Sequence, residues 1–465
     1  MIKPKIRERR IFTSRKHRNR RNSGLVAITS VVLVLLVLEL LTRIFVDLSG
    51  TRSQYAQASS QSDLNLAYQL QFAKEQITPD QIAKSNTLMA QPSLSVGYQL
   101  FNNQESPYYQ INSQGFRDSE PVSLLKPQEE IRIFLLGGST AFGYEIDGNQ
   151  NTIGEFLEQR LQQRLQQQQT SPNLYQPDLL PSDPTEKQKH LAKHPRIKTG
   201  KYRTINASVP GYASGNELAQ VALEILKYKP DLIVILDGYE DLMLPSDRQG
   251  IQAPAIESTQ SERISSFTDY LGKMVEKVEN KSYLAKIAQK RWLNSSPPPK
   301  QRFAFNESTP QLVNHLPSSP EELERRIQRY LEHHQQILSL SAAAKVPLIV
   351  ALQPEITGRN PSQLTDVEGK ITTELGRTYI KQMRDNYPVL INQIQKLANA
   401  YPQNLKVLDL YKLTDKYPSP SFVDPIHLNE AANQKVAEQL YYAIASFPKM
   451  QLVPKQAPTT VSNEQ

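Results

Sequence analysis

The stretch IRIFLLGGSTAFG, residues Ile131 to Gly143, decides how this chain is interpreted. Its first six residues are mostly apolar, as in a strand that is buried on both faces of a sheet. Two glycines follow and permit a sharp turn, so we expect Ser139 to project from the carboxyl end of the strand. An α/β enzyme presents a nucleophilic serine at such a position. A plain loop in which Ser139 or Thr140 caps a helix is the alternative, and the stretch alone leaves both interpretations open.

From residue 131 onward, strand patterns alternate with helix patterns. The expected strands cover residues 131–136, 202–207, 232–236, 348–352 and 406–410. The expected helices cover residues 153–165, 217–226, 319–344, 389–400 and 430–445. This alternation is typical of a parallel sheet with helices on both faces. We therefore predict a three-layer α/β/α domain with a five-stranded parallel sheet over residues 129–447.

Two stretches interrupt the alternation and are interpreted as insertions. Residues 166–200 are rich in Gln, Pro and Lys, a composition typical of a disordered excursion. Residues 243–318 contain helical spacing from Glu262 to Trp292 and then a proline-rich segment. Because this second insertion leaves the sheet at its carboxyl edge, it is either a lid over a site there or an inert surface elaboration. Residues 448–465 are expected to form a disordered tail.

The first 46 residues carry the pattern of a membrane anchor. Of the formal net charge of +8, the basic tail at residues 1–23 contributes +9 from ten Lys or Arg and one Glu, and the rest contributes −1. Residues 24–46 are almost continuously apolar and match the ~20 helical residues that cross a bilayer core. The charge before the span predicts a cytoplasmic N-terminus and an exported remainder. A signal peptide cleaved near Ala58 is the alternative, but the apolar core is unusually long and that position lies far beyond it.

The composition excludes several classes of function. The chain has 465 residues, enough for one large or two ordinary domains, and it contains no cysteine, which excludes disulfides and thiolate chemistry. Because the positive charge is confined to the tail, membrane topology explains it and no nucleic-acid partner is expected. Residues 47–128 are interpreted as a stalk and a lead-in segment, which includes the phrase INSQGFRD at residues 111–118 with a turn at Gly115.

A serine nucleophile needs a basic partner, and the seven histidines of the chain can be sorted by position. Six lie in the basic tail, in the insertions or side by side in a helix: His17, His190, His194, His315, His333 and His334. His427 instead follows the last expected strand, three residues after Asp424. An Asp and a His at this spacing can share one side of a turn, so that the carboxylate fixes the tautomer of the imidazole. A surface Asp beside a helix-capping His is the alternative.

Metal binding has one weak signal in the sequence. His190 and His194 have the i, i+4 spacing of a metal-binding pair, but no third ligand is evident near them. No metal site and no organic cofactor are therefore expected.

Four segments in order resemble the SGNH (GDSL-like) hydrolase family, over residues 129–446. The corresponding blocks are Gly137-Gly138-Ser139-Thr140, Pro210-Gly211, Gly238-Tyr239-Glu240-Asp241 and Asp424-Pro425-Ile426-His427. The resemblance implies an SGNH/flavodoxin-like fold in which Ser139 is the nucleophile, His427 the base and Asp424 its orienting partner. It also implies that the backbone N–H groups of Ser139 and Gly211 are oxyanion-hole donors. The phrase INSQGFRD is similar to what membrane-anchored bacterial relatives carry before their first strand.

The chain departs from the family pattern at two positions. Gly138 stands where an Asp before the serine is commoner, and Glu240 stands where the family places an Asn whose side-chain amide is the third oxyanion donor. An ionised carboxylate cannot donate a hydrogen bond, and its charge opposes an oxyanion. Three interpretations stay open: a slow esterase, an enzyme in which Glu240 is protonated or another group such as Asn206 or Asn216 substitutes, and a non-catalytic descendant.

The resemblance predicts a membrane-anchored, exported hydrolase that acts on ester bonds through a Ser139 acyl-enzyme without a cofactor. Acyl transfer to water gives an esterase, and transfer to a sugar hydroxyl gives an O-acyltransferase on envelope glycan. Glycans and lipids of a bacterial envelope are the candidate substrates, because the domain is expected to be periplasmic or otherwise extracytoplasmic. The alternative from another class is a binding or assembly protein that keeps the fold without the chemistry. The oligomeric state is not predicted.

Overall fold

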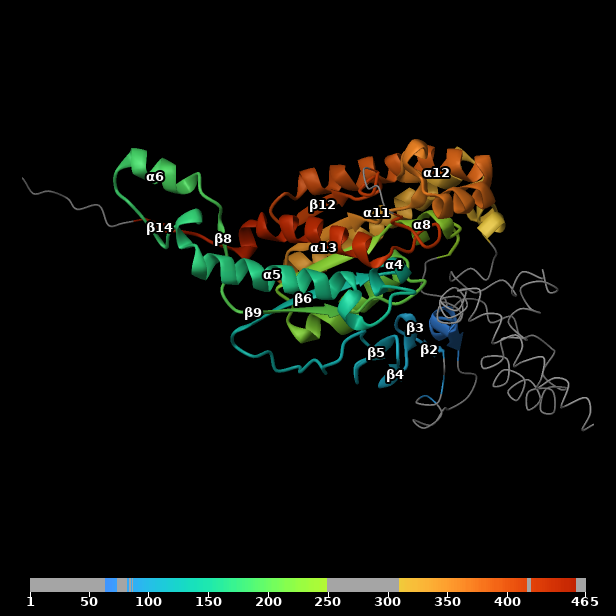
Figure 1. Ribbon diagram of the computed structural model, residues 1–465, viewed down its shortest axis with the longest axis horizontal. Coiled ribbons are helices and arrows are strands. Elements are labelled where there is room, and N and C mark those ends of the chain that lie inside the picture. Colours follow the sequence, from blue (N-terminus) through green and yellow to red (C-terminus); the bar gives the residue numbers. More distant parts are fainter. Residues whose placement is uncertain are drawn as a thin grey trace, which may run out of the picture. The chain divides into compact units, whose positions relative to one another are not determined.

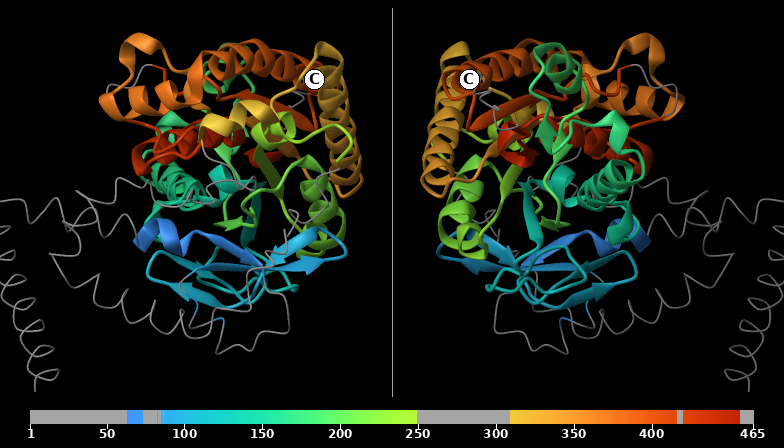
Figure 2. Two further views of the ribbon diagram at one scale, coloured as in Figure 1. Left: turned by 90° about the vertical axis from the view of Figure 1, so that its right-hand side faces the viewer. Right: turned by 90° about the vertical axis from the view of Figure 1, so that its left-hand side faces the viewer.

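The computed structural model describes residues 63–72, 82, 85, 87–248, 309–415 and 420–456, all of which belong to one unit. Figures 1 and 2 show this unit from three directions. The expected transmembrane span, the polar stalk before residue 63 and most of the second insertion lie outside the described residues. In the part that the structure describes, no helix combines the length and the apolar character needed to cross a bilayer.

The strand that precedes Ser139 lies inside the main sheet. It is β6 (Glu130–Gly137), which pairs with β9 (Lys201–Asn206) on one side and with β10 (Leu232–Asp237) on the other. Beyond β10 follow β11 (Leu348–Leu352) and β12 (Leu405–Asp409). All four pairings are parallel and the order is β12-β11-β10-β6-β9, which confirms the predicted five-stranded parallel sheet. Long apolar runs form these strands because helices cover both of their faces.

The strand order places a topological switch between β6 and β10. The chain passes from β6 to β9 on one side, and then crosses back to β10 and continues to β12 on the other. In open parallel sheets of this kind, crossovers that leave in opposite directions open a crevice outside the carboxyl ends of the two strands at the switch. Ser139 follows β6 and Glu240 follows β10, so both lie at the place where a site is expected.

Helices cover the two faces of the sheet (Figure 1). On one face, α5 (Ile153–Thr170) packs against α13 (Glu430–Ala445). On the other, α11 (Pro320–Ala343) packs against α7 (Ser214–Gln220) and α12 (Asp366–Ala400). The predicted three-layer α/β/α architecture is therefore present.

Helix α12 begins earlier than its sequence pattern indicates. The pattern predicts a helix only over residues 389–400, whereas the helix begins at Asp366. Thr365 and Glu368 form a capping box at this start. Gly376, with a φ of 78°, joins two helical segments, and Pro388 lies inside the second. Because a glycine and a proline inside a segment normally indicate the end of a helix, the sequence pattern did not predict the part of α12 before residue 389.

Two segments that were predicted to be disordered are ordered instead, and they pair with each other. In the first insertion, α5 continues to Thr170 and a further helix and two short strands follow. The C-terminal tail supplies two strands that pair with those of the insertion. The elements are α6 (Pro184–Leu191), with β7 (Leu179–Leu180) parallel to β14 (Lys455–Gln456) and β8 (Arg196–Ile197) antiparallel to β13 (Gln451–Leu452). Composition could not reveal this pairing, because the partner strands lie far apart in the chain. Residues after 456 lie outside the described part.

The lead-in segment lies along one side of the domain (Figure 2). Its side chains form a second, smaller apolar cluster. The segment contains a sheet of β1 (Leu70–Phe72), β2 (Leu88–Ser93) and β3 (Gly97–Leu100), and a hairpin of β4 (Gln104–Ser106) and β5 (Tyr109–Ile111). Side chains from this segment pack against Phe142 and Tyr144, which follow β6, and against Val209 and Tyr212, which follow β9. The lead-in therefore buttresses the two segments that carry Ser139 and Gly211.

Candidate active site

Ser139 opens the short helix α4 (Ser139–Phe142) directly after β6. The turn depends on Gly137, whose φ is 145° and whose Cβ, if it had one, would lie 2.2 Å from the carbonyl oxygen of Leu236 on the neighbouring strand. No other residue type fits such a contact. The N-cap of α4 is Gly138, without a side-chain capping bond, so the interpretation of Ser139 or Thr140 as a helix cap is wrong.

Asp424 and His427 lie in the loop between β12 and α13, and their side chains are hydrogen-bonded. His427 Nδ1 is 2.5 Å from Asp424 Oδ2. The other oxygen, Asp424 Oδ1, accepts the backbone N–H groups of Ile426 at 3.0 Å and of His427 at 2.8 Å. Both side chains are buried, which contradicts the alternative of a surface Asp beside a capping His. The carboxylate holds the imidazole so that Nδ1 faces Asp424 and Nε2 faces away from it.

The segment of Ser139 and the segment of His427 are in direct contact. Thr140 Oγ1 donates a hydrogen bond to the carbonyl oxygen of Ile426 at 3.2 Å. Gln353, which follows β11, donates from Nε2 to Thr140 Oγ1, also at 3.2 Å. Three strand ends are thereby linked next to Ser139. Sequence analysis missed Gln353, although its position directly after a buried strand was the available signal.

Tyr144 covers the imidazole of His427. The two rings are stacked, with their centroids 4.6 Å apart and an angle of 22° between their planes. The backbone N–H of Tyr144 donates to the carbonyl oxygen of Ser139 at 3.0 Å. One residue therefore contacts both the expected nucleophile and the expected base. Sequence analysis did not identify it, because nothing in the local pattern shows which ring will meet a histidine far along the chain.

Glu240 lies beside Ser139 and Gly138. It belongs to α8 (Tyr239–Met243), is only 4% exposed, and its carboxyl accepts a hydrogen bond from the backbone N–H of Ser139. A Cβ at position 138 would lie 2.4 Å from Glu240 Oε1, so any side chain there would displace the carboxyl. The two departures from the family pattern are therefore one structural arrangement: the glycine makes room for the glutamate.

The pKa of Glu240 is raised to about 8. Burial is the largest cause, and the negative charges of Asp241 and Asp237 add to it. Hydrogen bonds from the backbone N–H groups of Glu240 itself and of Ser139 oppose the shift. At neutral pH the carboxyl is therefore mostly protonated, and in that form it can donate a hydrogen bond.

The two asparagines considered as substitute donors are committed to backbone carbonyl groups. Asn206 Nδ2 donates to the carbonyl oxygens of Ala141 at 3.1 Å and Phe142 at 3.2 Å. Asn216 Nδ2 donates to the carbonyl oxygen of Val96 at 2.9 Å. The two bonds of Asn206 engage its amide donors, so this residue does not supply the third oxyanion donor. The single bond of Asn216 leaves its substitution a prediction.

Arg117, in the INSQGFRD phrase, ties the lead-in to the loop that follows α4. Its guanidinium is buried and donates to four carbonyl oxygens of that loop, those of Phe142, Gly143, Ile146 and Gly148. The expected turn is present at Gly115, which has a φ of 84°. Because this loop also carries Tyr144, the lead-in helps to hold the ring against His427.

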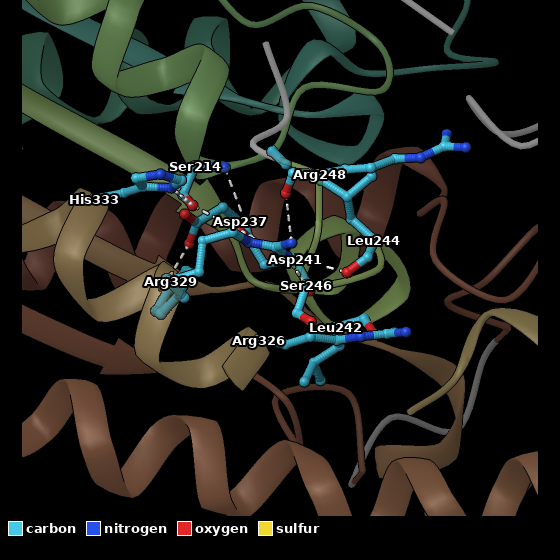
Figure 3. Close-up of polar contacts among 12 residues, drawn as sticks. Ser214, Asp237, Asp241, Leu242, Leu244, Ser246, Arg248, Arg326, Arg329 and His333 are labelled. Atoms are coloured by element: carbon cyan, nitrogen blue, oxygen red, sulfur yellow. Dashed lines mark hydrogen bonds and ion pairs between the residues drawn. The ribbon is translucent and has the colours of Figure 1, made fainter. Parts of the chain in front are cut away.

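His333 and His334 of α11 are buried and face different groups, as neighbours on a helix must. His333 Nδ1 lies 2.8 Å from Ser214 Oγ, which also donates to Asp241 Oδ1 at 2.6 Å (Figure 3). His334 faces Asp237 instead. Sequence analysis excluded both histidines as the base and did not foresee these contacts. His190 and His194 lie in the first insertion, and in the described part of the chain they belong to no group of side chains that could hold a metal ion.

The residues that lead into the second insertion are held by two arginines of α11 (Figure 3). Arg326 donates to the carbonyl oxygens of Leu242 and His315, and Arg329 donates to several carbonyl groups between residues 241 and 248. The insertion thus leaves the sheet from an anchored segment. Whether it is a lid or an inert surface elaboration stays open, because residues 249–308 lie outside the described part.

Comparison with known proteins gives one family match. Residues 133–440 match the family model described as GDSL-like lipase/acylhydrolase. Among solved structures, the chain is similar to a lipase/acylhydrolase from Enterococcus faecalis, with 16% identity over 70% of this chain and 100% of that chain and a TM-score of 0.31. It is also similar to an acetyl xylan esterase (12%, 67% and 99%, TM-score 0.31) and to a GDSL-like lipase from Bacteroides thetaiotaomicron (11%, 68% and 91%, TM-score 0.29). No curated protein matches the chain.

Proposed function

The chain belongs to the GDSL-like lipase/acylhydrolase family, and on that premise we propose that it is a serine hydrolase of oxygen esters. Ser139 is the nucleophile, His427 the general base and Asp424 the residue that orients the base. The observation that supports this most strongly is the buried hydrogen bond between Asp424 and His427, in a loop that contacts the residue next to Ser139.

The proposed reaction has two halves. Ser139 Oγ attacks the ester carbonyl carbon while its proton passes to His427 Nε2, and the carboxylate of Asp424 stabilises the imidazolium that forms. The tetrahedral intermediate then expels the alcohol, which takes the proton from His427, and leaves an acyl group on Ser139. A water molecule attacks the acyl-enzyme with the same base, and the products are the free acid and the restored serine.

Glu240 supports this chemistry only in its protonated form. In the structure its carboxyl accepts the N–H of Ser139, one of the two backbone donors expected for the oxyanion, the other being that of Gly211. When substrate binds, the developing oxyanion replaces the carboxyl as the acceptor of that N–H, and the O–H of the neutral Glu240 supplies the third hydrogen bond. A neutral acid held in an apolar site is a known form of oxyanion donor. An ionised Glu240 would instead repel the negative charge.

We place the reaction outside the cytoplasmic membrane. The basic tail and the apolar stretch at residues 24–46 support a single-pass anchor with a cytoplasmic N-terminus. An anchored, extracytoplasmic esterase meets acylated glycans and lipids of the envelope, and these are the proposed substrate classes. If a sugar hydroxyl replaces water in the second half-reaction, the same residues catalyse O-acyl transfer.

A fluorophosphonate probe tests the proposal directly, because it labels only an activated serine. The wild-type protein is expected to be labelled, and Ser139→Ala is expected to lose the label. Ser214→Ala, which removes a buried serine 2.8 Å from His333, is expected to keep it. Failure to label a folded wild-type protein would favour a binding or assembly protein that keeps the fold. Release of free acid from model acetyl esters, with and without an added sugar acceptor, then separates hydrolysis from transfer.

A further inference from the structure

A second group of buried polar side chains lies between the carboxyl end of β10 and the helices α7 and α11. Glu217 comes from α7, Asp237 from the last position of β10, and His334 from α11. All three are completely buried. One side-chain nitrogen or oxygen atom from each residue lies within 4.8 Å of the corresponding atoms of the other two. The three residues come from distant parts of the chain and have no common spacing, so sequence analysis expected no metal here.

The atoms that converge are the ones that lack hydrogen bonds to other described residues. Both carboxyl oxygens of Glu217, Oδ2 of Asp237 and Nε2 of His334 are buried, and in the described part of the chain none of them has a hydrogen-bond partner outside these three residues. His334 Nε2 and Asp237 Oδ2 lie only 3.1 Å apart. Buried polar atoms of this kind destabilise a fold unless something pairs with them. Four nitrogen and oxygen atoms with lone pairs in one buried place are stabilised by a positively charged partner.

That partner is not an arginine or a lysine. Among the described residues, no ion pair joins Glu217 or Asp237 to either type of side chain. The nearby guanidinium of Arg329 is directed at backbone carbonyl groups, including those of Asp241 and Leu244 (Figure 3). Among the described residues, the two buried carboxyl groups therefore have no permanent cation beside them, and His334 pairs with Asp237 as a cation only when its imidazole is protonated.

The surrounding hydrogen bonds orient these atoms as they would orient metal ligands. His334 Nδ1 donates to the carbonyl oxygen of Tyr330 at 3.0 Å, so in the neutral imidazole Nε2 carries a lone pair that faces Asp237. The hydroxyl of Tyr330 donates to Asp237 Oδ1 at 2.9 Å and leaves Oδ2 for the cluster. An outer contact that fixes the histidine tautomer and another that holds the carboxylate are usual around protein metal sites.

We propose that Glu217, Asp237 and His334 bind one divalent cation of the first transition series, with Zn²⁺ as the metal to test. One imidazole nitrogen and two carboxylate oxygens suit this class, whereas Ca²⁺ takes six to eight oxygens and Cu⁺ prefers sulfur. Bonds of about 2.0–2.2 Å place tetrahedral ligand atoms roughly 3.3–3.6 Å apart, a few tenths of an ångström more than the 3.1 Å between His334 Nε2 and Asp237 Oδ2. The flexible side chain of Glu217 closes the remaining gap, and the fourth position is left for a water molecule.

Two protons are the competing occupants, one on Glu217 and one on His334 Nε2. They would bring the same total charge as a divalent cation, so charge alone does not separate the two cases. The variant Glu217→Gln separates a bound metal ion from a pair of protons. Its amide imitates a protonated glutamate and preserves a proton-sharing network, but it removes an anionic metal ligand.

The experiment measures metal in the full-length protein. The protein is purified, its metal content is determined by elemental analysis, and a chelator-treated sample is titrated with ZnCl₂ while thermal unfolding is followed. We expect about one Zn²⁺ per chain, a Tm that rises with zinc, and at least tenfold weaker binding in Glu217→Gln and in His334→Gln. His190→Gln is the matched control, a histidine in the first insertion, and should bind zinc as the wild type does.

Two results would overturn the proposal. One is a folded wild-type protein that holds no metal after purification and binds none of Zn²⁺, Mn²⁺, Co²⁺ or Ni²⁺ in the titration. The other is a Glu217→Gln variant that binds zinc with wild-type affinity. Should His334→Gln fail to fold, the wild-type titration and Glu217→Gln still decide the question. Fluorophosphonate labelling of the same samples is independent, so a metal-free but labelled protein would refute this site and leave the proposed function intact.

Discussion

The proposed triad of Ser139, His427 and Asp424 can be compared with a buried trio of Ser214, His333 and Asp241, because the hydrogen bonds of the histidine and the aspartate differ between them. In the candidate active site, Asp424 is bonded to His427 Nδ1, which leaves the far side of the ring for a hydroxyl. In the buried trio, Ser214 lies between its two partners: its hydroxyl donates to Asp241 and faces His333 Nδ1 (Figure 3). A hydroxyl whose proton is already directed at a carboxylate is not activated by the imidazole. The order of the bonds, more than the residue types, separates a catalytic group from a structural one.

Removing each serine gives the largest expected contrast. Ser139→Ala should lower kcat for model esters by about 10⁶-fold, as loss of a serine nucleophile does elsewhere. Ser214→Ala should leave kcat within about threefold and lower the free energy of unfolding by about 1–3 kcal/mol, because Asp241 loses a buried hydrogen-bond donor. Steady-state kinetics and urea unfolding of both variants measure this. A large loss of kcat in a folded Ser214→Ala would contradict the distinction between the two groups.

Substitution of Asp424 and of Asp241 is expected to give a similar but smaller contrast in kcat. Asp424→Asn should reduce kcat by about 10⁴-fold, because an amide that donates to His427 Nδ1 holds the imidazole in the wrong tautomer. Asp241→Asn should change thermal stability while kcat at the optimum stays within about tenfold. Similar losses of kcat in the two variants would mean that the trio of Ser214, His333 and Asp241 also takes part in the reaction.

The protonation state of Glu240 is expected to set how activity depends on pH. Because only the protonated carboxyl donates to the oxyanion, kcat should fall about tenfold per pH unit above its pKa of about 8. Glu240→Gln, which always carries N–H donors, should keep its activity above that pH. An unchanged alkaline fall in this variant would show that another group sets the profile.

The same residue affects stability in a defined direction. Its pKa is raised in the folded protein from 4.5 to about 8, so between these values the folded state holds a proton that the unfolded state has lost. The contribution of neutral Glu240 to stability is therefore complete below pH 4.5 and is lost as the pH rises through about 8. Urea unfolding across this range should show a smaller decline in Glu240→Gln than in the wild type.

The smallest expected effect concerns the ring stacked on His427. Tyr144→Leu removes an aromatic contact worth roughly 0.5–1.5 kcal/mol, so kcat/KM should fall about two- to tenfold. The control is Tyr175→Leu, since Tyr175 packs against His194 in the first insertion, where no effect on activity is expected. A fall of the same size in the control would indicate a general loss of folded protein.

The sheet could be predicted from the sequence because each central strand is a continuous apolar run that ends in a recognisable turn. The positions of Ser139 and His427 followed from the same rule, since Ser139 comes directly after β6 and His427 lies in the loop that connects β12, the last strand of the sheet, to α13. Contacts between distant segments could not be predicted. Nothing near Gln353 or Tyr144 in the sequence indicates Thr140 or His427 as a neighbour.

Composition gave a wrong prediction of disorder for two segments whose strands pair with each other in the folded domain. The glutamine-rich insertion and the C-terminal tail each read as disordered, yet β7 and β8 of one pair with β14 and β13 of the other. Glu217, Asp237 and His334 were missed for a related reason. Each is unremarkable in its own segment, and only the packing of α7 and α11 on β10 brings them together.

The close fit of Glu240 against Gly138 couples substitutions at the two positions. Starting from this chain, an Asp at position 138 would push a second acid into the space that the glutamate fills, and the two would repel each other. Replacing Glu240 with the shorter Asn instead leaves the glycine facing a gap. Neither single substitution towards the commoner family pattern is therefore expected to be favourable alone, and the effects of the two substitutions on stability should not be additive.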